Sequence, residues 1–356
     1  MSNTSLLGSY GAQDSSSLMF RNRIINGSMT IDQRNAGANA GLGGNTEVFI
    51  TDRFKVARAG GTATLSTIRQ VTTISGETNF DGAFAAPAGF THALKVQIGT
   101  AQAVGTTFET EIKHSLEGFN GADWGWGTAD ARPVTLSFWV KSSLTGNFGV
   151  GMRSATFNYS IVTSYTINAA NTWEYKTITI TPPTSGTFYQ DTRLHHTLYW
   201  DLGVGSTFST SSLNTWQAAD FRGGLTGGVK LAETAGANFY ITGVQLEAGP
   251  TATPFERRPI GVERQLANRY CQTLMVNITA YASNESSGII FPTVMRAGPG
   301  LVSSATSWTR VGVGNTSTTV TGFNLSGETG IHSIYWSGGL VAGGLYSGGI
   351  VVSAEL

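Results

Sequence analysis

One stretch, residues 238–258 (NFYITGVQLEAGPTATPFERR), limits the possible folds more than any other part of the chain. Its residues alternate with period two, and its first half carries apolar side chains on both faces, which predicts a strand that closes a large β-sheet core. Gly249-Pro250 and Pro254 then prevent further strand pairing. Beyond them the pattern changes to helical spacing, so a domain is predicted to end here.

Short alternating segments recur before this stretch, with Gly, Pro, Asn and Ser between them. They include residues 23–31, 52–56, 94–98, 134–141 and 194–202. Because no amphipathic helix separates them, they indicate antiparallel sheets rather than an α/β fold. We therefore predict an all-β protein whose main domain, residues 23–258, is a large antiparallel jelly-roll sandwich. Its first strand, near Ile24, and its last, near Ile241, are expected to be neighbours in a sheet.

A single helix is predicted directly after the exit turn, as a linker over residues 259–275. Pro259 suits a helix start, and an apolar residue recurs at every fourth position. The resulting stripe consists of Val262, Leu266, Tyr270 and Leu274. So narrow a stripe packs either on the sandwich or against copies of itself around a symmetry axis. In the second interpretation these four residues form a subunit interface.

The two ends of the chain are predicted to differ from the sandwich. Residues 1–22 are polar and aperiodic, which fits either an attachment arm that becomes ordered on docking or a disordered tail. Residues 276–356 return to short strands and predict a smaller C-terminal β-sandwich, poor in charge and marginal alone. The glycine-rich repeat within it is either a loosened hairpin or an adaptable contact loop. In the second interpretation Leu340, Leu345 and Tyr346 touch the partner.

The composition argues against several kinds of partner and site. Only 12% of the residues are charged and the formal net charge is zero, so nothing electrostatic attracts nucleic acid or an anionic membrane. The lone Cys271 excludes a disulfide framework and a cysteine zinc site within one chain. The sequence shows neither a basic and apolar leader nor an apolar run of about 20 residues. We therefore expect a protein made in the cytoplasm, without a signal peptide or membrane insertion.

Tryptophans supply the candidate binding residues. A glycine-rich loop places two indoles beside an amide and a carboxylate, at Asn120, Asp123, Trp124 and Trp126. A sugar ring is bound by such a flat aromatic face flanked by polar groups. The competing interpretation is packing against the sandwich rim or a neighbouring subunit. Trp139 is out of phase with Phe138 and is expected on the outer face of a sheet. Core or subunit contacts are expected for Trp173, Trp200 and Trp216.

The signs of catalysis are weak. His195 and His196 are adjacent in a predicted strand, so they should point to opposite faces and share neither a metal nor a proton. No zinc-protease, serine-hydrolase or phosphate-loop motif is present. A glycosidase needs two carboxylates about 5–9 Å apart. The candidate pairs are Glu111 with Glu117 and Asp191 with Asp201. We expect no catalytic residue, no metal ligand and no cofactor.

Several pieces of the chain, taken in order, resemble the tail-fibre and tail-tip proteins of tailed bacteriophages, whose N-terminal part looks like a carbohydrate-binding jelly roll. The pieces are RIINGSMTIDQR at 23–34, TDRF at 51–54, VTLSFWVKS at 134–142, WEYK at 173–176, NTWQ at 214–217 and the opening stretch through Glu256. They cover about residues 20–275, whereas the C-terminal domain matches only loosely, over residues 291–297.

This resemblance implies a homotrimeric virion protein that contacts polysaccharide or lipopolysaccharide on the host surface. The N-terminal arm would dock on phage tail or adaptor proteins. The C-terminal domain, with Leu340, Leu345 and Tyr346, would then face the host. Two other hypotheses stay open: a decoration or tail-adaptor protein that contacts only virion proteins, and a polysaccharide depolymerase.

Overall fold

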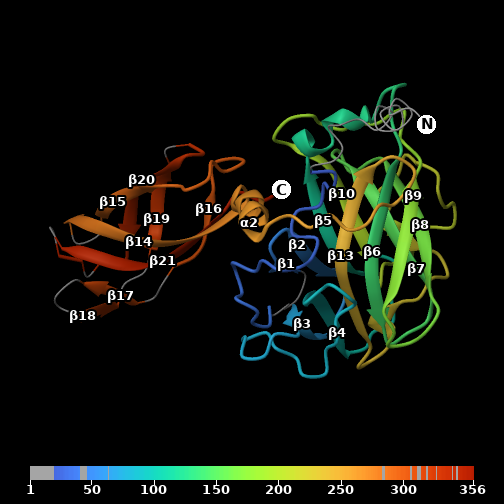
Figure 1. Ribbon diagram of the computed structural model, residues 1–356, viewed down its shortest axis with the longest axis horizontal. Helices are drawn as coiled ribbons and strands as arrows, with labels where there is room; N and C mark the ends of the chain where they lie inside the picture. Colours follow the sequence, from blue (N-terminus) through green and yellow to red (C-terminus); the bar gives the residue numbers. More distant parts are fainter. Residues whose placement is uncertain are drawn as a thin grey trace, which may run out of the picture.

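The computed structural model describes residues 20–40, 46–62, 64–282, 285–304, 307–310, 314–317, 320–325, 327–338, 340–341 and 344–356. Two β bodies of unequal size are joined next to one short helix (Figure 1). The expected all-β class with a large antiparallel sandwich is confirmed by the pairing of its strands. No helix in the described part of the chain is both long enough and apolar enough to cross a bilayer. The predicted attachment arm, apart from its last residues, lies outside the described residues.

The described residues of the larger body form thirteen strands. They are β1 (Thr46–Thr51), β2 (Phe54–Ala59), β3 (Thr64–Thr72), β4 (His92–Thr100), β5 (Glu109–Glu117), β6 (Val134–Ser142), β7 (Gly146–Ser154), β8 (Ser160–Ile167), β9 (Glu174–Ile180), β10 (Leu194–Asp201), β11 (Ser209–Thr210), β12 (Gly224–Leu225) and β13 (Asn238–Ala248). A six-stranded sheet has the order β1-β2-β5-β10-β7-β8, and a five-stranded sheet has the order β3-β4-β13-β6-β9. Every pairing within these two sheets is antiparallel.

The helix and the smaller body follow. They comprise α2 (Ile260–Asn268), β14 (Cys271–Ala282), β15 (Glu285–Ile290), β16 (Gly300–Ser304), β17 (Ser307–Arg310), β18 (Gly314–Ser317), β19 (Val320–Leu325), β20 (Gly330–Trp336) and β21 (Leu345–Ser353). The order β18-β17-β21-β14-β15-β20-β19, with β16 added beside β21, wraps these strands around a separate apolar core. Trp308 and Trp336 meet edge to face at 4.5 Å in that core.

The core of the larger body lies between the two sheets because their strands alternate as the sequence predicts. On β6, Val134, Leu136, Phe138 and Val140 are buried in this core, together with Ile241 of β13. The residues between them, such as Trp139, point to the outer face of the five-stranded sheet. Burial of one face of each sheet therefore fixes which side chains are left for the outer faces.

Strand β13 is the centre of the five-stranded sheet, paired with β4 on one side and β6 on the other. Residues 23–31, predicted as the first strand, form no strand, and this prediction is wrong. They make a turn that lies on β13: Arg23 N donates to the Leu246 carbonyl at 2.8 Å, and Val244 N donates to the Gly27 carbonyl at 2.9 Å. The β13 ladder with β6 is interrupted between Thr242 and Gln245, and the turn supplies hydrogen-bond partners there.

The linker helix is shorter than predicted, because β14 already begins at Cys271 and pairs with β21. Tyr270 and Leu274 therefore lie outside the helix, and their side chains are buried within this chain. Tyr270 packs against Ile25 and Ala267, whereas Leu274 belongs to the core of the smaller body. The prediction that these two residues form a subunit interface is corrected to internal packing. Val262 and Leu266 stay half-buried, and for them the interface remains a prediction.

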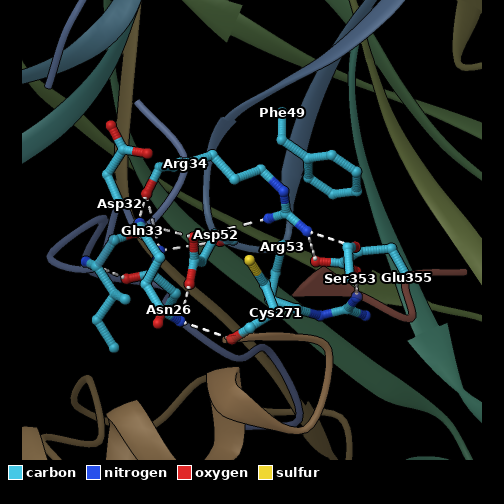
Figure 2. Close-up of polar contacts among 12 residues, drawn as sticks. Asn26, Asp32, Gln33, Arg34, Phe49, Asp52, Arg53, Cys271, Ser353 and Glu355 are labelled. Carbon is cyan, nitrogen blue, oxygen red and sulfur yellow. Dashed lines mark hydrogen bonds and ion pairs between the residues drawn. The ribbon is translucent and has the colours of Figure 1, made fainter. Parts of the chain in front are cut away.

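A buried ionic network joins the two bodies (Figure 2). The guanidinium of Arg53, only 2% exposed, pairs with Glu355, donates to the Ser115 carbonyl and stacks 3.6 Å from the Tyr270 ring centre. Arg34 donates to Glu355 at 3.2 Å from the other side. A carboxylate of the smaller body is thus held by two arginines of the larger one. Such a desolvated group is stable only while its partners are present.

Gln33 strengthens the same joint. Its Nε2 donates to the Asp52 carboxylate at 2.7 Å and to the Cys271 carbonyl at 2.8 Å, so one amide ties the larger body to the start of β14 (Figure 2). Burial raises the pKa of Asp52 to about 6, against the opposing charge of Arg34. These contacts predict that the two bodies keep one orientation.

We predict that Glu355→Ala lowers the free energy of unfolding by about 3–5 kcal/mol, because it leaves Arg53 buried without its carboxylate and removes one of the two carboxylates beside Arg34. Denaturant unfolding measures this loss. Glu328→Ala, which removes an exposed carboxylate of the same body, is the control and should change stability by less than about 0.5 kcal/mol. An equal effect of the two substitutions would contradict a joint held by Glu355.

We also predict that Gly27→Ala destabilises the larger body, because a Cβ at this position would lie 2.1 Å from the backbone oxygen of Val244. Overpacking of this kind costs about 1–3 kcal/mol, and here the atom that must move belongs to the central strand. Gly261→Ala, where nothing lies within 4 Å, is the control for thermal unfolding. An unchanged melting temperature for Gly27→Ala would show that the turn at residues 23–31 does not pack closely against β13.

Candidate functional site

The two tryptophans predicted to stack on a sugar are buried. Trp124 is 0% exposed and Trp126 is 3% exposed. Trp124 meets the ring of His195 edge-on at 5.6 Å, and Trp126 meets Trp216 edge-on at 5.6 Å while its indole N–H donates to the Arg132 carbonyl at 2.8 Å. The faces of both indole rings are covered by neighbouring side chains of this chain. The prediction that Trp124 and Trp126 stack on a sugar is therefore corrected to internal packing.

Their polar neighbours are not brought together with them. Asp123 is exposed and forms an ion pair with Arg23 at 2.7 Å. Asn120 lines a shallow hollow near Phe20 and Leu266, away from the indole faces. The four residues of the predicted glycan site therefore form no common surface.

The two histidines are closer to each other than predicted. The register of β10 against β5 shifts between Leu194 and His196, and this bulge lets the Nδ1 atoms of His195 and His196 approach to 2.8 Å. The prediction that they share no proton is wrong. Burial lowers the pKa of His195 to about 3 and that of His196 well below its ordinary value, so both rings are neutral at pH 7. Each is 1% exposed, which keeps this proton from any substrate.

The predicted carboxylate pairs do not form glycosidase sites. Glu111 and Glu117 lie on β5 six positions apart, a separation of about 20 Å along a strand. Glu117 is held by the Tyr270 hydroxyl and by Arg269. Asp201 is buried and accepts from the backbone N–H groups of Gly203 and Val204. Its suggested partner, Asp191, forms a surface ion pair with Arg193 at 2.7 Å, before the other end of β10.

Glu111 is the most perturbed acid on the outer face of the six-stranded sheet. It is 0% exposed, and neither carboxylate oxygen accepts a hydrogen bond, although Lys113 Nζ lies 3.1 Å away. Burial raises its pKa to about 7, against the opposing charge of Lys113. Arg222 pairs with neighbouring Glu109, and its guanidinium lies 3.9 Å from the Phe208 ring centre. Glu111 is a desolvated acid that has no opening to solvent.

The outer face of the five-stranded sheet is different, because aromatic rings there remain partly exposed. Trp139 of β6 and Tyr175 of β9 are cross-strand partners with ring centres 5.4 Å apart. Tyr175 is 41% exposed and Trp139 is half-buried. Thr177 and Thr179 follow on the same face of β9 and are exposed, so hydroxyls continue the surface beyond the rings. The expectation that Trp139 covers an outer sheet face is confirmed.

Two phenylalanines extend this surface across β13. Gly243 lies in the bulge with φ +61°, and a Cβ there would be 2.7 Å from Phe90 and 3.1 Å from Trp139. A glycine is therefore required for the rings to close over the strand. Phe90 meets Phe255 edge-on at 5.1 Å, and the Arg257 guanidinium lies 4.7 Å from the Phe90 ring centre. We call Trp139, Tyr175, Phe90 and Phe255 the aromatic surface.

Next to the aromatic surface, a lysine fills an aromatic box. Lys141 Nζ lies 4.3 Å from the ring centre of Tyr240, 5.3 Å from that of Trp173 and 5.6 Å from that of Phe84. Burial lowers its pKa. The side chain of Lys141 thus occupies the place that a ligand cation would take between these rings.

Of the four residues of the aromatic surface, only Trp139 was predicted from the sequence. The out-of-phase position of Trp139 was the signal for it. Tyr175 stands in a strand with the same alternation and could have been found in the same way. Phe90 and Phe255 lie outside strands, and only the glycine within the β13 pattern pointed to a close approach at that place.

The smaller body places the predicted contact loop mostly inside. Leu340 and Tyr346 are buried in its core, and the Tyr346 hydroxyl accepts from Val341 N at 2.8 Å. The prediction that these two residues touch a partner is corrected to internal packing. Leu345 is 42% exposed and remains a predicted contact. Residues 339, 342 and 343 of the loop lie outside the described part of the chain.

No group of three His, Cys, Asp or Glu side chains that could hold a metal occurs among the residues that the structure describes. No family model matches the chain, and no curated protein matches its sequence.

Solved structures with partial likeness include the enzymatically active domain of bacteriophage CBA120 tailspike protein 4, with 11% identity over 64% of this chain and a TM-score of 0.34. The match spans 22% of the tailspike chain. A family 11 carbohydrate-binding module from Clostridium thermocellum, solved with a mixed-linked tetrasaccharide, has 14% identity over 58% of this chain and 96% of its own, with a TM-score of 0.26. Likenesses this weak assign no activity to the chain.

We predict that Glu111→Gln makes stability less dependent on pH. The folded protein binds this proton more tightly than the unfolded chain, whose pKa is near 4.5, so stability is lost as pH rises from 4.5 through 7. The cost in the parent protein is at most about 3 kcal/mol at pH 8. Melting temperatures at pH 5 and pH 8 should therefore differ less in the variant. An equal change in melting temperature between pH 5 and pH 8 in Glu111→Gln and in the surface control Asp130→Asn would contradict this prediction.

Proposed function

We propose that this protein is a non-enzymatic tail-fibre or receptor-binding protein of a tailed bacteriophage, and that it contacts host surface glycan as a homotrimer. The observation that supports glycan binding is the aromatic surface, in which the exposed ring of Tyr175 lies beside Trp139. The virion part rests on the sequence motifs that resemble tail-fibre proteins. In this proposal the N-terminal arm docks on the tail and residues 276–356 face the host.

Physical chemistry supports a neutral glycan as the partner. Aromatic faces cover the C–H side of a sugar ring, and nearby hydroxyls and guanidinium groups bond its rim. Tyr175 of the aromatic surface supplies such a face, and the neighbouring Thr177 and Arg257 supply the hydroxyl and the guanidinium. A formal net charge of zero gives no attraction for polyanions. Weak single sites are sufficient when three copies act together, because linked sites raise the effective concentration.

The absence of catalysis is part of the proposal. Among the described residues, the acid with the clearest shift toward neutral pH, Glu111, is 0% exposed and therefore closed to solvent. A general acid must reach the atom that it protonates. We expect no release of reducing ends from host polysaccharide.

A second candidate function is a decoration or tail-adaptor protein that contacts only other virion proteins. The same aromatic surface supports it, because exposed aromatic rings are also frequent at protein interfaces. A density map of the particle separates the two: the aromatic surface is solvent-exposed in a receptor-binding protein and covered by a neighbour in an adaptor.

We predict that Tyr175→Ala and Trp139→Ala each weaken binding to host polysaccharide or lipopolysaccharide at least about tenfold, which is about 1.4 kcal/mol per site. Surface plasmon resonance on immobilised glycan measures this. Phe119→Ala, which removes a ring 57% exposed at another part of the surface, is the matched control. Wild-type affinity in the tyrosine and tryptophan variants would refute the aromatic surface as the contact. Native mass spectrometry of the parent protein should show three chains.

A further inference from the structure

A polar cleft lies where the larger body meets the start of α2. Its volume is about 550 Å³, and its walls come from the N-terminal segment at Thr30, Asp32 and Ala36, the end of β3, the loop that follows it, the start of β4 and the first two turns of the helix. Glu77, Asn79 and His92 line it together with Ile260 and Arg264 of α2. None of these residues belongs to the aromatic surface or to the ionic network of the joint.

The floor of the cleft is held in place by buried amides. Gln70 and Asn79 are each 4% exposed; Gln70 donates to the Met29 carbonyl, and Asn79 donates to Gln70. His92 Nδ1 is hydrogen-bonded to Thr91 at 2.8 Å, and its Nε2 lies 3.6 Å from Glu77. The Glu77 carboxylate, the His92 imidazole and the Arg264 guanidinium around an opening of this volume can bond the hydroxyls of one or two sugar rings.

The charges of the cleft select the kind of sugar. Asp32 and Glu77 contribute two carboxylates and Arg264 contributes one guanidinium. Burial lowers the pKa of His92, which favours the neutral ring. Asp32 also interacts with Arg34 and accepts hydrogen bonds from Asn35 N and Gly37 N. The cleft therefore has no excess positive charge to hold a uronic or sialic acid, and a neutral sugar suits it better.

A continuous surface connects this cleft to the aromatic surface. Thr30 and Ile260 line the cleft and also a smaller hollow of about 180 Å³, whose opposite wall contains Phe255 and Arg257. Phe255 meets Phe90, and Phe90 approaches Trp139 over Gly243. Rings and hydrogen-bonding groups thus follow one another from Tyr175 on β9 to Arg264 on α2.

We infer that the ligand is a chain of neutral sugars, with its inner units on the aromatic surface and its terminal unit in the cleft between Glu77 and Arg264. This inference rests on the proposed glycan function and specifies its ligand. It makes Glu77 and Arg264 residues that recognise the end of the chain, whereas Tyr175 and Trp139 bind every length.

Calorimetry with a length series tests the inference. The probes are neutral oligosaccharides, from monosaccharide through octasaccharide, cut from the polysaccharide that the wild-type protein binds best. Affinity should rise with length until one chain spans both regions. Glu77→Gln and Arg264→Ala should each reduce affinity for the longest probe at least about tenfold and leave the shortest bound probe unchanged. Gln265→Ala, an exposed neighbour on α2 outside the cleft, is the control and should bind like wild type.

The outcomes separate the two levels of the proposal. If both cleft variants bind the longest probe like wild type, or if wild-type affinity does not depend on length, the cleft is no sugar site while the aromatic surface stands. If wild-type protein binds no glycan of any length, the proposed function itself is wrong. Equal melting temperatures for all variants show that each effect comes from binding, because Glu77 and Arg264 are surface side chains.

Discussion

The structure depends on the pairing of β13 with β4 on one side and β6 on the other, which a bulge in the middle of β13 interrupts. The bulge at Thr242–Gln245 has two consequences on opposite sides of the chain. It exposes backbone groups that Asn22 and Gly27 satisfy, since the Asn22 amide donates to the Val244 carbonyl and its oxygen accepts from Leu246 N. It also places Gly243 beneath Phe90 and Trp139. One local departure from regular pairing thus positions both the N-terminal turn and the aromatic surface.

A chain with only 12% charged residues uses many of its charges inside. Arg53, Arg34 and Glu355 fix the two bodies to each other, and Glu111 is buried beside Lys113 on the six-stranded sheet. The buried charges of the joint are paired with specific partners, and buried charges give little attraction at long range. Around Trp139 and Tyr175, the outer face of the five-stranded sheet presents aromatic rings and threonine hydroxyls, which suits short-range contact with a neutral partner.

The all-β class, the closing strand and the helix start were predictable, because period-two alternation and the exit prolines are local signals. The end of the helix could not be predicted. The apolar stripe continues to Tyr270 and Leu274, but the helix ends before them because β14 begins at Cys271 and pairs with β21, which lies far away in sequence. The burial of Trp124 likewise depends on His195 and on a bulge that no local pattern reveals. Of the candidate site, Trp139 and Tyr175 could be placed from alternation, whereas Phe90 and Phe255 join them through tertiary contacts.

The most direct test of glycan recognition by the outer face of the five-stranded sheet is a crystal structure of the protein with a bound oligosaccharide. Sugar rings stacked on Tyr175 and Trp139, with the chain running over Phe255 toward Ile260, are the predicted result. Sugar density at the sandwich rim, at the smaller body or on the six-stranded sheet, with the aromatic surface unoccupied, would contradict it.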